Sequence, residues 1–166
     1  MRPDVWELGE APRWHAATRS FTWVDILQGR ALVATFANGA LTDERFFDFP
    51  VAVGAVERVS DGWQAAAGTG FWAADDDFRF REVQRVAGLD HTYRANDAAC
   101  DPQGRLVAGF MTSSAEPGTG ILARLSPADG GFETRILLTG CTIPNGLAWS
   151  PDGTELFHAD SGMRVI

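Results

Sequence analysis

The sequence contains no lysine, and all 14 of its basic residues are arginines. They are outnumbered by 22 acidic residues, which gives a formal net charge of −8 at pH 7. The arginines form no cluster along the chain. Nucleic acids and anionic membrane surfaces attract proteins through concentrated positive charge, so this charge balance argues against both as partners.

Long apolar runs are also missing from the chain. No stretch approaches the roughly 18 apolar residues of a membrane-spanning helix, and the N-terminal segment MRPDVWELGE lacks the apolar region of a signal peptide. We therefore expect a cytoplasmic protein. The two cysteines, Cys100 and Cys141, have neither metal-binding nor redox-motif spacing, which predicts that both are reduced and structural.

Sustained helical periodicity of apolar residues is absent as well, and 18 glycines and 8 prolines interrupt the chain. The sequence instead contains short runs rich in β-forming residues, separated by polar turns. Hairpins are predicted at 31–36 with 41–47, around Asn38-Gly39, and at 121–125 with 132–138. The fold class is therefore predicted to be all-β.

A repeat runs through further hairpins of the same kind. Glu10, Gly54, Asn96 and Asn145 occupy one place in four copies, at spacings of 44, 42 and 49 residues. Strand-containing repeats of roughly 40 to 50 residues are typical of β-propeller blades, each with four strands. Because the chain has only three asparagines, two of them at one repeat position indicate a shared role.

The length sets a limit on this propeller. With about 45 residues per repeat, 166 residues hold roughly three and a half blades. Residues 1–166 are therefore predicted to form a single incomplete β-propeller domain. It would leave sheet edges open, and we expect missing C-terminal blades or another chain to cover them.

The repeat position carries oxygen ligands suited to a metal. In a propeller the innermost strands line a central channel, where a carboxylate and an amide oxygen would converge. Such donors suit Ca²⁺, Mg²⁺ or Mn²⁺ and can accept Zn²⁺. The alternative is that these side chains only satisfy backbone groups at blade turns.

Other acidic residues have structural explanations. Asp25 and Asp160 occupy matching places after two of the hairpins, and we expect them to fix strand ends. The run at 75–77 lacks the glycine and distal glutamate of a calcium loop, which predicts a solvated surface.

Three segments together resemble one family. LGEAPRWHAATRSFTWVDI at 8–26, YRANDAACDPQGRLVAGFM at 93–111 and IPNGLAWSPDGTELFHADS at 143–161 are similar, in order and spacing, to the gluconolactonase family. That family includes regucalcin (senescence marker protein), bacterial sugar lactonases and luciferin-regenerating enzyme. The resemblance implies a six-bladed propeller with one divalent metal, Ca²⁺ by preference, and a small sugar lactone as substrate. Strictosidine-synthase-like propellers are disfavoured, because their chemistry does not rest on this pair of Glu and Asn.

The resemblance also implies roles for single residues. Glu10 and Asn145 match metal ligands, Arg94 and Asn96 match substrate-binding residues, and Asp97 matches a buried acid that orients its strand. The catalytic Asp of the family comes from a later blade, beyond residue 166. The expected function is metal-dependent hydrolysis of an aldonolactone to the aldonic acid, with this piece inactive alone; the alternative is a propeller that binds Ca²⁺ or a sugar acid without turnover.

One further expectation concerns the copy that has no polar side chain at the repeat position. Gly54 is expected to leave room in the channel beside the other three residues.

Overall fold

The computed structural model describes residues 6–166, which form fourteen strands and no helix. The strands make four antiparallel sheets, and in each sheet the strands follow one another in chain order. The all-β class predicted from the sequence is confirmed. No helix among these residues could cross a membrane.

Three sheets have four strands each, and the last has two. The first contains β1 (Gly9–His15), β2 (Ser20–Asp25), β3 (Arg30–Ala37) and β4 (Ala40–Asp48). The second contains β5 (Val53–Val59), β6 (Gly62–Ala67), β7 (Gly70–Ala74) and β8 (Arg81–Arg85). The third contains β9 (Tyr93–Cys100), β10 (Leu106–Thr112), β11 (Gly120–Ala128) and β12 (Gly131–Cys141). The fourth contains β13 (Pro144–Trp149) and β14 (Leu156–Asp160).

Turn chemistry explains where the hairpins reverse. Between β3 and β4, Asn38 has φ 52° and Gly39 has φ 79°. Two consecutive positive φ angles define a type I′ turn, for which Asn-Gly is the favoured pair because its twist matches that of the flanking strands. Both predicted hairpins, β3 with β4 and β11 with β12, are present.

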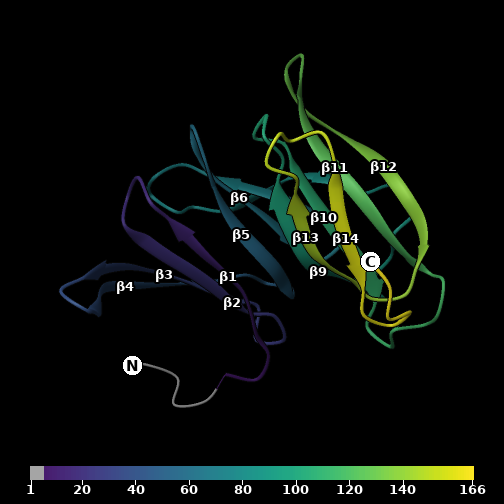
Figure 1. The fold of residues 1–166 in the computed structure, drawn as a ribbon, viewed down its shortest axis with the longest axis horizontal. Helices are drawn as coiled ribbons and strands as arrows, with labels where there is room; N and C mark the ends of the chain where they lie inside the picture. Colours follow the sequence, from purple (N-terminus) through teal and green to yellow (C-terminus); the bar gives the residue numbers. More distant parts are fainter. Residues whose placement is uncertain (1–5) are drawn as a thin grey trace.

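The first strand of each sheet lies on the inside of the arrangement. β1, β5, β9 and β13 lie toward the middle of Figure 1, whereas β4 and β12 lie at its left and right sides. β9 contacts both β5 and β13, so the inner strands are neighbours although they belong to different sheets. This arrangement is consistent with the blades of a β-propeller.

The core fills the space between these sheets and is rich in alanine. Every residue of β6 is buried, and three of its six residues are the consecutive alanines at 65–67. Larger side chains interlock around this strand, with Phe71 and Phe110 fully buried and in edge contact at 5.6 Å between ring centroids. Small residues on the inner strands let the sheets approach closely, and the aromatic residues fill the wider gaps.

Some large apolar side chains remain exposed on the first and last parts of the fold. Trp14 and Phe36 of the first sheet are 49% and 41% exposed, and they line an apolar groove of about 450 Å³. On the opposite side, Ile136 and Leu138 of β12 and Phe157 of β14 are similarly exposed.

Candidate functional site

The repeat position coincides with a β-bulge in each inner strand. A bulge adds a residue to one strand of a pair and redirects side chains, and bulges are common next to functional sites. Glu10 and Asn145 are each followed by a residue in the left-handed region, Ala11 with φ 49° and Gly146 with φ 53°. The irregularities fall between Glu10 and Arg13, Val53 and Ala55, Ala95 and Ala98, and Asn145 and Ala148.

Two buried carboxylates fix the chain just before β1 and β13. Asp25 is fully buried and Asp160 is 3% exposed. Each accepts hydrogen bonds from two backbone N–H groups, 18 and 17 residues earlier in the chain: Glu7 at 2.7 Å and Leu8 at 3.2 Å for Asp25, and Thr142 at 2.7 Å and Ile143 at 3.0 Å for Asp160. The expected structural role of both residues is confirmed, and it sets how β1 and β13 enter the site.

Arg94 and Asn96 lie together on β9. Arg94 Nη1 donates to Asn96 Oδ1 at 2.8 Å and to the Ala95 carbonyl oxygen at 3.0 Å. Asn96 Nδ2 in turn donates to the carbonyl oxygen of Pro144 at 3.0 Å, directly before Asn145. Asn96 therefore connects Arg94 to the strand that carries Asn145, and its amide is only 9% exposed.

Glu10 and Asn145 complete the group of four predicted residues. Burial lowers the pKa of the half-buried Arg94 guanidinium, and the negative charge of Glu10 opposes this shift, which shows that the two groups are within electrostatic reach. Glu10 is exposed, and its carboxylate makes no hydrogen bond to the described residues. Asn145 Nδ2 donates to Ser161 Oγ at 3.2 Å, and its Oδ1 accepts none from residues 6–166.

The Glu10 carboxylate and the Asn145 Oδ1 accept no hydrogen bond from residues 6–166. A carboxylate and an amide oxygen without other partners are hard donors of the kind that Ca²⁺, Mg²⁺ and Mn²⁺ prefer. Two such donors leave most coordination positions for other ligands. Among residues 6–166, no group of three His, Cys, Asp or Glu side chains could hold a metal ion.

Gly54 does not open space in the site, and the expectation of a gap there was wrong. A Cβ added at Gly54 would stand 2.9 Å from the backbone carbonyl carbon of Ala95 and from the backbone nitrogen and oxygen of Asn96. Such distances are too short for a real Cβ contact. The glycine lets β5 pack directly against the backbone of β9, and so it supports the segment that holds Asn96.

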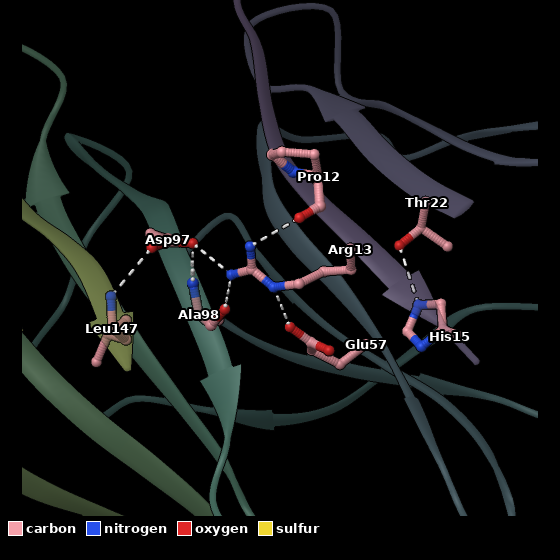
Figure 2. A network of polar contacts seen from close by, with 8 residues as sticks. All are labelled: Pro12, Arg13, His15, Thr22, Glu57, Asp97, Ala98 and Leu147. Atoms are coloured by element: carbon pink, nitrogen blue, oxygen red, sulfur yellow. Dashed lines mark hydrogen bonds and ion pairs between the residues drawn. The ribbon is translucent and has the colours of Figure 1, made fainter. Parts of the chain in front are cut away.

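An ion-pair network that the sequence analysis missed is centred on Arg13 (Figure 2). Arg13 of β1 donates from Nε to Glu57 Oε1 of β5 at 2.7 Å, and from Nη2 to Asp97 Oδ1 of β9 at 3.0 Å. The same Nη2 donates to the Ala98 carbonyl oxygen at 2.7 Å. Asp97 Oδ2 accepts from the Leu147 N–H of β13 at 3.4 Å. The network therefore joins all four inner strands.

Burial and charge act in opposite directions within this network. Burial raises the pKa of the Glu57 carboxyl and Asp97 adds to the rise, whereas Arg13 opposes it. For Arg13, burial lowers the pKa, but Glu57 and Asp97 more than compensate, so the guanidinium stays charged. Asp97 contacts both Arg13 and the Leu147 N–H, so it links β9 to β1 and β13.

A hollow of about 430 Å³ opens beside Arg94. Its lining combines apolar side chains such as Leu27, Val51 and Leu89 with the polar side chains of Arg85, Asp90, His91 and Arg94. Of the four predicted residues, Arg94 lines this hollow, and Glu10, Asn96 and Asn145 do not. Ligand sites are usually concave and largely apolar, with a few polar groups that fix orientation. A small molecule in this hollow would lie within reach of the Arg94 guanidinium.

Comparison with known families agrees with this arrangement. The family model described as the SMP-30/Gluconolactonase/LRE-like region matches residues 8–166. The chain is 28% identical to 6-deoxy-6-sulfogluconolactonase from Pseudomonas putida, over 99% of the chain and 55% of that relative. It is 31% identical to L-arabinolactonase from Azospirillum brasilense, over 96% of the chain and 53% of that relative.

Solved structures show the same fold. A calcium-binding protein, regucalcin, from Agrobacterium tumefaciens superimposes with a TM-score of 0.81 at 26% identity, covering 93% of this chain and 51% of that one. Luciferin-regenerating enzyme superimposes with a TM-score of 0.82 at 23% identity, covering 95% of this chain and 53% of that one. The chain thus spans about half the length of the relatives it matches.

Proposed function

Because the chain belongs to the SMP-30/gluconolactonase/LRE-like family, we propose that it forms part of a divalent-metal-dependent lactonase that opens a sugar lactone to its aldonic acid. Relatives named as lactonases support this reaction class. The observation that carries the proposal is that Glu10 and Asn145 occur at equivalent bulges of β1 and β13, and that Glu10 acts electrostatically on the half-buried Arg94.

We also propose that the four sheets are blades of a six-bladed propeller. The first three sheets each have the four strands of a complete blade, and β13 with β14 would begin a fourth. The exposed apolar groove around Trp14 and the exposed side chains of β12 and β14 would then be covered by further blades or by another chain. Their apolar character supports this placement.

Glu10 and Asn145 would hold the cation, with Ca²⁺ the first candidate and Zn²⁺, Mn²⁺ or Mg²⁺ the alternatives. When bound, the cation supplies polarisation of the lactone carbonyl and stabilises negative charge on its oxygen. Arg94 uses only Nη1 in its hydrogen bonds to residues 6–166, so its remaining N–H groups can donate to the lactone or its hydroxyls. Asn96 holds the Arg94 guanidinium in place through its Oδ1.

The attacking water needs a general base. We propose that this base comes from a residue outside 6–166, as the resemblance to the gluconolactonase family implies. The 166-residue chain would then bind the cation and the sugar without turning the lactone over.

The proposal that the chain binds cation and sugar without hydrolysing the lactone can be tested with the purified 166-residue chain, gluconate and D-gluconolactone. Calorimetry should show that gluconate binds in the presence of Mn²⁺, that binding is lost with chelator, and that it weakens about tenfold in Arg94→Met because charged hydrogen bonds contribute roughly 1.5–3 kcal/mol. If the wild-type chain and Arg94→Met bound gluconate equally well, with or without Mn²⁺, the proposed site would be contradicted. Chelator-sensitive hydrolysis above the uncatalysed rate would support the lactonase and overturn the external base.

A further inference from the structure

The Arg13 guanidinium is surrounded by acceptors from three inner strands. It contacts Glu57 of β5, Asp97 and the Ala98 carbonyl of β9, and the Pro12 carbonyl of its own strand at 3.2 Å (Figure 2). The side chains of Arg13, Glu57 and Asp97 are 26%, 10% and 13% exposed. Each guanidinium nitrogen donates at least once to these groups.

The residues of this network lie in or next to the bulges that contain the candidate site residues. Arg13 is the first regularly paired residue after the bulge that begins at Glu10. Asp97 follows Asn96 within the bulge of β9. Leu147, whose N–H Asp97 binds, lies within the bulge that begins at Asn145. Every contact of the network thus fixes the backbone within three residues of a candidate ligand or substrate-binding residue.

Backbone pairing cannot do this, because the inner strands belong to different sheets and are not paired with one another. The relative position of Glu10, Asn96 and Asn145 depends on side-chain contacts between sheets. Asn96 with the Pro144 carbonyl supplies one such contact, and it joins only β9 and β13. The Arg13 network joins β1, which carries Glu10, to β5 and β9 by polar contacts, beside the packing of Ala11 and His15 of the same strand.

We propose that Arg13 is a positioning residue that sets the distance between Glu10 on β1 and the pair Asn96 and Asn145 on β9 and β13. This inference rests on the cation site proposed above. A positioning role differs from a purely structural one because it changes affinity at the site while leaving the fold intact.

Arg13→Lys is the sharpest variant for this test. Lysine keeps the positive charge between Glu57 and Asp97, but a single ammonium cannot reproduce the fork that reaches both carboxylates and the Ala98 carbonyl. We expect hydrogen exchange of the Leu147 N–H to accelerate about tenfold and Mn²⁺ affinity to fall about tenfold, as is typical when a residue that orients a ligand is lost. The slowest-exchanging amides of β6 and β10 should remain unchanged.

The matched control is Arg30→Lys. Arg30 Nε contacts Asp48 Oδ1 at 2.7 Å, the same distance as in the Arg13 pair, but on the outer strands β3 and β4. This control should leave both Leu147 exchange and Mn²⁺ affinity at wild-type values.

The outcomes separate the two proposals. Unchanged Leu147 exchange in Arg13→Lys, or faster exchange with unchanged Mn²⁺ affinity, would overturn the positioning role alone. A wild-type chain that binds Mn²⁺ no better than Glu10→Gln would overturn the cation site itself, and the positioning role with it. Faster exchange together with weaker binding, in Arg13→Lys but not in Arg30→Lys, supports the inference.

Discussion

Glu10→Gln is expected to weaken Mn²⁺ binding by roughly 100-fold. Mutation of a residue that only supports a metal ligand typically lowers metal affinity by roughly 10- to 100-fold, and the loss of a charged ligand should reach the upper end of that range. The substitution keeps the side-chain volume and one oxygen but removes the only negative charge among the proposed donors. Because Glu10 is exposed and makes no hydrogen bond to residues 6–166, the free energy of unfolding should stay within about 0.5 kcal/mol of the wild-type value. Titration calorimetry and urea denaturation measure the two quantities.

Glu133→Gln provides the control for this prediction. Glu133 is an exposed glutamate of β12, so the variant makes the same change in charge on an outer strand. Mn²⁺ affinity should be unaffected there. Equal losses in Glu10→Gln and Glu133→Gln would show that binding follows net charge alone and would contradict a site at Glu10.

Asp160→Ala is expected to lower the free energy of unfolding by about 3 kcal/mol or more, because it removes a buried charged acceptor and leaves several donors unpaired. The Asp160 carboxylate accepts hydrogen bonds from four backbone N–H groups. Two precede β13, Thr142 at 2.7 Å and Ile143 at 3.0 Å, and two follow β14, Gly162 at 3.0 Å and Met163 at 3.1 Å. Urea denaturation followed by circular dichroism gives the value. Asp152→Ala, in the exposed turn between the same two strands, should cost much less.

Acid should reproduce part of this loss in the wild-type chain. Burial raises the pKa of the Asp160 carboxyl, but hydrogen bonds from four backbone N–H groups lower it by more than burial raises it. The folded-state pKa therefore lies below its ordinary value. The stabilisation is therefore complete above the ordinary Asp pKa and is lost as the pH falls through the lowered folded-state value. Asp160→Ala should show a shallower decline of stability as the pH falls below about 4, the ordinary pKa of an Asp carboxyl. The same decline in both proteins would contradict this role.

The hairpins could be predicted because their signals are local. Asn38-Gly39 specifies its turn by backbone conformation, and alternating or continuous apolar runs specify the strands beside it. The outer strand β8 was not predicted, since Val83 is the only apolar residue in REVQR. An exposed outer strand needs little apolar surface, so its place in the sheet depends on pairing with β7.

The candidate site was predictable only in part, because its geometry depends on contacts between sheets. Repeat position identified Glu10, Asn96 and Asn145, but it could not show the bulges or the packing of Gly54 against β9. A signal for the network did exist. Arg13 and Glu57 are 44 residues apart, the spacing of Glu10 and Gly54, so opposite charges occupy one place in neighbouring copies.

The central claim is that the inner strands bring Glu10 and Asn145 together at one cation site. Paramagnetic broadening by substoichiometric Mn²⁺, read from ¹H–¹⁵N spectra of the 166-residue chain, tests it most directly because the broadening falls steeply with distance from the ion. The amide signals of Glu10, Asn96 and Asn145 should broaden first, including the side-chain amide of Asn145. Broadening that begins instead at the exposed acidic run 75–77 would contradict the claim.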